Sequence, residues 1–173
     1  MISGILLVDK HGQLTHGEDR HATRTSEAFY REALDILGFE YDVFDVNVPS
    51  GVVLSEGPDT AGMKYYDTQI WFSGDYGWYS LRPSDQLNLI EWLSQSAEGK
   101  ERNFLLTGND NGQWLMDGLA ETLDFYTTWL ASEYVQNDPG DAFPDTMPTL
   151  RDASGGFDFL TYDDRFCHLW SDW

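Results

Sequence analysis

The segment Phe104–Trp114, FLLTGNDNGQW, shows the pattern from which the fold is deduced. An apolar run enters a tight polar turn at Gly108–Gly112, and residues at helical spacing follow the turn. A strand that leads through a short turn into a helix is the repeating unit of α/β proteins. Many enzymes place a nucleophile at the apex of this turn, but the apex here is Asn109 or Asp110 instead of serine or cysteine.

The same alternation of strand and helix recurs along the chain. Phe29, Ala33, Ile36 and Leu37 recur at helical spacing and Gly38 supplies a left-handed stop, which predicts a helix over residues 25–37. A second helix is predicted from Pro83 to about Gly99, with an inward stripe of Leu87, Ile90, Leu93 and Ala97 that Leu89 and Trp92 broaden. The predicted strands are 5–8, 39–46, 68–73, 103–107, 130–135 and 157–162.

Strands that alternate with helices predict βαβ units and a mostly parallel sheet. We therefore expect an α/β protein of the three-layer α/β/α sandwich type, flavodoxin-like, with strand order 2-1-3-4-5. Residues 1–173 are expected to form a single domain with an irregular C-terminal portion from about residue 137, where Pro139, Pro144 and Pro148 interrupt the pattern. Strand-like residues begin almost at Met1, which is typical of a domain excised from a larger protein, with no signal peptide in the chain.

The charge of the chain excludes several classes of partner. Ten basic residues against thirty acidic ones give a formal net charge of −20 and a pI near 4.1. Nucleic acids and anionic membranes would be repelled, and no apolar run approaches the ~18 residues needed for membrane insertion. A divalent cation such as calcium is the candidate cofactor that this charge suggests; a purely solubilising surface is the alternative.

Three aspartates follow three predicted strands, and they form the first candidate site. Asp9, Asp75 and Asp110 would meet at one edge of the sheet, where their carboxylates could bind a hard cation. Tyr76 and Asn109 stand beside them as further ligand-binding candidates. The alternative is that each aspartate caps a neighbouring backbone amide.

The second candidate metal site is the histidine-rich loop after the first strand. His11, His16 and His21 are evenly spaced there, but they lack helical spacing and a cysteine partner, so solvated loop histidines are the alternative. The one cysteine, Cys167, excludes an intrachain disulfide and is expected to be a small buried apolar residue. We assign no catalytic residue from the sequence.

The order of these segments resembles a known family. The stretches ILLVD, AFYREALDILGFEYDVFDV, TQIWFSGDYGWYSLRPSDQLNLIEWL, NFLLTGNDNG and FYTTWLASEYV are similar to class I glutamine amidotransferase-like domains of large secreted bacterial proteins. The similarity covers roughly residues 4–136, and its most telling part runs from Ile70 to Gly108. The catalytic cysteine of true amidotransferases is replaced by Asn109 and Asp110, so the resemblance implies a scaffold that does not hydrolyse glutamine.

This resemblance implies a non-catalytic accessory or binding module, located outside the cell or on its surface. Its expected partners are neighbouring domains of a parent protein or a protein or glycan ligand. A metal-assisted hydrolase that uses Asp9, Asp75 and Asp110 is the alternative function.

Overall fold

The computed structural model describes residues 4–10, 25–46, 56–73, 81–108, 111–117, 124–132, 149–150 and 160–161. Two compact units are distinguished, Met1–Tyr134 and Val135–Trp173. In the second unit, the two-residue strands β5 (Thr149–Leu150) and β6 (Leu160–Thr161) pair antiparallel. The first unit contains the sheet, and the site described below lies within it.

Four parallel strands form the sheet of the first unit. They are β1 (Ile5–Asp9), β2 (Tyr41–Asp45), β3 (Thr68–Phe72) and β4 (Asn103–Thr107), in the order β2-β1-β3-β4. The order and the interleaved helices confirm the predicted flavodoxin-like α/β fold. The fully buried Leu7 is paired with Val43 on one side and Ile70 on the other, as expected for a central strand.

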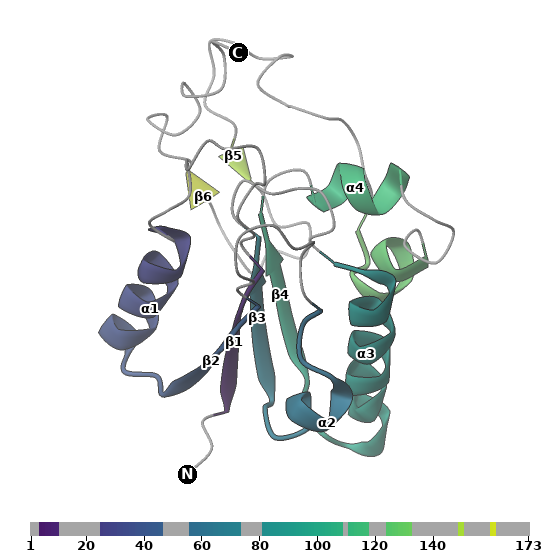
Figure 1. Ribbon diagram of the computed structural model, residues 1–173, viewed down its shortest axis with the longest axis horizontal. Coiled ribbons are helices and arrows are strands. Elements are labelled where there is room, and N and C mark those ends of the chain that lie inside the picture. The colour runs from purple at the N-terminus through teal and green to yellow at the C-terminus, as the bar shows by residue number, and fades with distance from the viewer. Residues whose placement is uncertain are drawn as a thin grey trace. The chain divides into compact units, whose positions relative to one another are not determined.

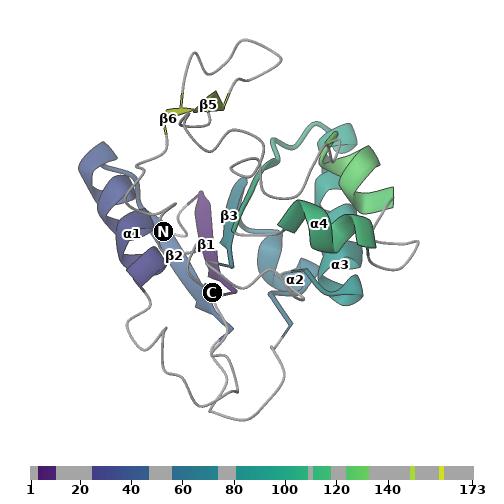
Figure 2. The same cartoon turned by 90° about the horizontal axis from the view of Figure 1, so that it is seen from above.

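Helices cover both faces of this sheet, but unequally (Figure 1). α1 (Thr25–Leu37) lies alone on one face, whereas α2 (Thr60–Met63), α3 (Pro83–Ser94) and α4 (Asn111–Asp117) lie on the other (Figures 1 and 2). The short helical turns η1 (Gln95–Glu98) and η2 (Phe125–Trp129) follow α3 and α4 in the chain. Within the part of the chain that the structure describes, no helix has the length and apolar character to cross a bilayer.

The face under α3 holds the larger core, and we call it the packed face. Trp71 of β3 lies fully buried there, and its ring meets Phe104 of β4 edge-on with the ring centres 6.1 Å apart. Gly57 packs so closely on the Trp71 indole that any side chain at position 57 would collide with it. The buried residues of this cluster are Leu6, Val8, Met63, Trp71, Leu81, Leu89, Trp92, Leu115 and Phe125.

The opposite face, which we call the α1 face, buries fewer side chains of its helix. Leu34 is the buried apolar residue of α1, and Tyr30 stacks on Phe72 of β3 with the ring centres 4.6 Å apart. The apolar residues that predict this helix from the sequence, Phe29, Ala33, Ile36 and Leu37, are all exposed; we call them the outer stripe of α1.

Two predictions made from the sequence need correction, one about the buried side of α3 and one about a strand after η2. α3 begins at Pro83 as expected, and the predicted Leu89, Ile90, Trp92 and Leu93 lie in the core cluster or pack against it. Asp85 and Gln86 are buried as well, whereas Leu87, predicted to face inward, is 64% exposed and Ala97 is exposed. The expected strand over residues 130–135 is absent from its described part, 130–132, because Leu130 ends η2 and Ala131 adopts a positive φ of 48°. Residues 133–135 lie outside the described residues.

Candidate functional site at the carboxyl edge of the sheet

The carboxyl ends of β1, β3 and β4 lie at one edge of the sheet, because the three strands are parallel and adjacent. The register pairs Asp9 with Phe72, and Phe72 with Thr107, so the three strands end level with one another. Ligand sites of open α/β sheets lie outside this edge. The side chains that follow the three strands are therefore the ones to examine.

A buried ion pair stands directly after β1. Lys10 Nζ donates to Asp85 Oδ2 of α3 at 2.7 Å, and the two side chains are 1% and 0% exposed. The Lys10 backbone N–H donates to the Phe72 carbonyl at 2.8 Å, which ties the residue to the end of β3. The pair therefore joins the sheet to the first turn of α3.

Asp85 also accepts two backbone hydrogen bonds. Its Oδ1 accepts from the Gly57 N–H at 2.7 Å, and its Oδ2 accepts from the Arg82 N–H at 2.9 Å in addition to Lys10. An acidic side chain in the first turn of a helix commonly accepts such a hydrogen bond from a backbone N–H at the start of the helix. Three donors on one carboxylate hold it in a fixed position.

Burial is the largest influence on the pKa of Lys10. Removal from water lowers the pKa of the Lys10 ammonium below its usual range, and the Asp85 carboxylate opposes this effect by charge and hydrogen bonding. The ammonium also lies 5.9 Å from the centre of the Trp71 ring. The charge is thus enclosed between an aromatic ring and a carboxylate, inside the packed face.

A second polar contact joins the ends of β3 and β4 to the start of α4. Ser73 Oγ donates to Asn111 Oδ1 at 3.2 Å, and the Ser73 N–H donates to the Thr107 carbonyl at 3.0 Å. Gly108 lies against both side chains with a φ of 149°, so a Cβ there would collide with Ser73 and strain the backbone. The turn quoted at the outset therefore begins at a position that only glycine fits.

α1 reaches the same edge of the sheet through one side chain. The Tyr30 hydroxyl and Thr107 Oγ1 share a hydrogen bond, and the Tyr30 ring stacks on Phe72. Thr107 is the last residue of β4, so Tyr30 spans from the helix to the far strand of the sheet. This contact anchors α1 beside the carboxyl edge.

Of the predicted site residues, the structure describes one. Asp9 is the last residue of β1, and 2% of its surface is exposed. Asp75, Tyr76, Asn109 and Asp110 lie outside the described residues, as do His11, His16 and His21. The proposed meeting of the three aspartates therefore stays a prediction. Among the residues that are described, no three His, Cys, Asp or Glu side chains are close enough to hold a metal ion.

Sequence reasoning missed the Lys10–Asp85 pair. Asp85 lies in the first turn of α3, where the helix dipole favours an anion, but its main partner is 75 residues earlier in the chain. In the sequence, Lys10 follows Asp9 at the end of the first strand, and no local feature shows that its side chain is buried. A buried cation requires a buried anion, and only the fold brings Asp85 to it.

Comparison with known proteins gives no relative for this chain: no family model, no curated protein and no solved structure matches it. The strand order and the interleaved helices therefore carry the fold assignment by themselves.

Proposed function

We propose that this chain is a non-catalytic binding module of a secreted bacterial protein, built on a degenerate class I amidotransferase-like scaffold. The observation that carries the proposal is the state of the Lys10–Asp85 pair. Both side chains are enclosed, and Asp85 accepts three hydrogen bonds from the fold itself. A general acid or base must reach the proton that it transfers, and these groups are turned toward one another instead.

The turn after β4 supports the same conclusion. An elbow enzyme needs a serine or cysteine on the turn, with a base beside it. The residues from Gly108 to Gly112 contain neither, and the Ser73–Asn111 contact beside them has no described acid or base among its bonds. The polar groups that are described at this edge hold strands and helices together.

A test of catalysis separates this proposal from the metal-assisted hydrolase. The purified chain would be incubated with chromogenic phosphate monoesters and acetate esters, with Ca²⁺, Mg²⁺, Mn²⁺ or Zn²⁺ and with EDTA. We expect no turnover above the rate of buffer with the same ion. Metal-dependent turnover that Asp75→Asn or Asp110→Asn abolishes would overturn the proposal, because it would show the three carboxylates working together.

Thermal melting of the same samples tests the cation separately. An ion that binds only the folded state raises its melting temperature, and the rise grows with the logarithm of the ion concentration above the dissociation constant. A rise with Ca²⁺ that EDTA reverses, without turnover, would make calcium a ligand of the module. An unchanged melting temperature with every ion would remove the cation and leave a protein or glycan as the partner.

A further inference from the structure

The outer stripe of α1 is an apolar surface that the described residues of the chain leave exposed. Phe29 is 59% exposed, Ile36 is 77% exposed and Leu37 is 67% exposed. The spacing of four, three and one residues between Phe29, Ala33, Ile36 and Leu37 places these side chains along one side of the helix. Exposed apolar residues that cluster in this way mark interaction sites more often than single ones do.

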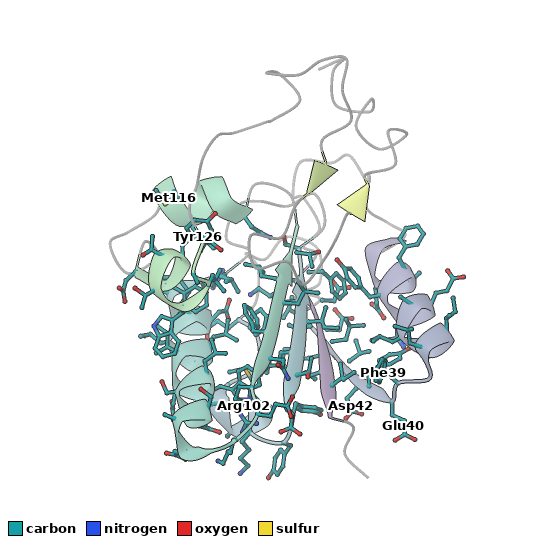
Figure 3. The ribbon with its side chains drawn as sticks, turned by 180° about the vertical axis from the view of Figure 1, so that it is seen from behind. Phe39, Glu40, Asp42, Arg102, Met116 and Tyr126 are labelled. Atoms are coloured by element: carbon teal, nitrogen blue, oxygen red, sulfur yellow. The ribbon has the colours of Figure 1, made fainter. Side chains whose placement is uncertain are left out.

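A further exposed aromatic residue, Phe39, follows the end of the helix. Gly38 has a φ of 75° and turns the chain, and the Phe39 N–H donates to the Leu34 carbonyl at 3.0 Å. Phe39 is exposed, and it lies with Glu40 at the end of α1 remote from the carboxyl edge (Figure 3). The exposed apolar residues thus run from 29 to 39, and their helical part, 29–37, is about 12 Å long.

The surroundings of the stripe carry a strong negative charge. Residues 25–46 contain six carboxylates, against a single cation, Arg31. Arg31 is already engaged, since it pairs with Glu27 at 2.5 Å. Glu32, Asp35 and Glu40 are exposed around the stripe, and none of them forms an ion pair within the described residues.

This combination argues against a second copy as the occupant. Each copy has a formal net charge of −20, and two α1 surfaces brought together would set carboxylates against carboxylates. A partner with lysines or arginines around an apolar centre would instead meet both features. A helix is the element that fits, because the ridge of side chains along α1 packs into the grooves of another helix.

We propose that the outer stripe of α1 docks a cationic amphipathic helix of a partner protein, which rests on the proposed binding function and supplies its partner class. The apolar side chains of the partner cover Phe29, Ile36 and Leu37. Its basic side chains face Glu32, Asp35 and Glu40. The carboxyl edge of the sheet takes no part in this contact.

The probe is a synthetic helical peptide of about 14 leucines and lysines, with leucine at the spacing of one helical face. A fluorophore on the peptide reports binding to the full chain by anisotropy. A peptide of the same composition with the order scrambled measures the attraction due to charge alone. We expect the amphipathic peptide to bind at least about tenfold more tightly than the scrambled one.

Variants of the chain locate the contact. Phe29→Ser with Ile36→Ser is expected to weaken peptide binding at least about tenfold, whereas Leu87→Ser, which alters an exposed leucine of α3, should leave it unchanged. Glu32→Gln with Glu40→Gln should reduce the dependence of the affinity on salt. All these side chains are exposed, so circular dichroism melting is expected to match that of the unaltered chain.

Several results would overturn the inference. Equal affinity for the two peptides, equal affinity of the Phe29/Ile36 variant, or no binding at all would each show that the stripe docks no cationic helix. A concentration-dependent dimer in sedimentation velocity that the same variant dissolves would assign the surface to a second copy. These failures leave the turnover assays unaffected, and metal-dependent turnover with intact peptide binding would overturn the non-catalytic function alone.

Discussion

The two faces of the sheet differ in how completely the described residues cover them. On the packed face, Trp71 and Phe104 of the sheet meet Leu89 and Trp92 of α3 in a continuous cluster. On the α1 face, Leu105 of β4 is 50% exposed. Leu105 lies on this face because Thr107, two residues later in the strand, bonds to Tyr30 of α1. Among the described residues, one face of the sheet is therefore shielded from water and the other is partly exposed to it.

The two faces therefore contribute differently to the free energy of folding. Apolar surface removed from water contributes roughly 25 cal/mol per Å², so the packed face supplies the larger share of the folding free energy. The apolar residues that stay exposed on the α1 face contribute little to it. The unequal layers thus give the fold its stability on one side and leave on the other the surface that we propose binds a partner.

The largest expected effect comes from breaking the ion pair of the packed face. Asp85→Ala removes the acceptor of Lys10 and of two backbone N–H groups, and leaves a buried ammonium without its counter-charge. We expect a loss of about 3–5 kcal/mol in the free energy of unfolding, measured by urea denaturation.

Asp59→Ala is the matched control for that substitution. Asp59 caps α2 by accepting from the Gly62 N–H at 2.8 Å, but it is exposed, so about 1 kcal/mol is expected. A loss for Asp85→Ala no greater than the loss for Asp59→Ala would show that the pair does not hold the packed face together.

A second comparison uses identical changes on helices of the two faces. Leu89→Ala leaves a cavity in the packed face, where the side chain is fully buried, and should cost about 2–5 kcal/mol. Leu87→Ala on the same helix and Ile36→Ala on α1 remove exposed side chains and should each stay within about 0.5 kcal/mol. A cost for Ile36→Ala close to that of Leu89→Ala would mean that the outer stripe is covered by the chain itself.

The smallest expected effect is a dependence of the stability on pH, which tests how completely Lys10 is shielded from water in the packed face. Burial lowers the pKa of Lys10 in the folded state, so between that lowered pKa and the usual value of 10.5 the unfolded chain holds the extra proton. The stability of the wild type relative to Lys10→Met should therefore rise with pH in this window, by less than ~1.4 kcal/mol per pH unit. Urea denaturation at neutral and alkaline pH measures the difference, and a difference that falls with rising pH would contradict the assignment.

Local patterns predicted the elements of the first unit closely. The helix over residues 25–37 and the strand over 103–107 have the predicted bounds, since a capped apolar period and a β-branched or aromatic run are encoded by neighbouring residues. Leu130–Ser132 does not follow its apolar pattern, because Leu130 ends the η2 turn, where its N–H donates to the Phe125 carbonyl at 3.1 Å. A short apolar run does not distinguish a strand from the end of a helical turn.

The buried side of a helix was harder to predict from the sequence than the helix itself. In α3, the predicted inward stripe contained Leu87, which is exposed, and omitted Asp85 and Gln86, which are buried. Sequence reasoning assigns polar residues to the surface by default. Only a partner elsewhere in the chain offsets the hydration that a polar residue loses on burial. Lys10 is that partner for Asp85, and no local pattern points from one to the other.

The sequence by itself determined the α/β class, the strand order over four strands and the excess of negative charge, because periodicity, turn residues and ionisable groups act over short distances or by simple addition. Only the tertiary structure decided that Lys10 and Asp85 meet inside the packed face and that Phe29, Ile36 and Leu37 stay outside. Burial depends on what the rest of the chain brings to each surface, and that is a property of the assembled layers.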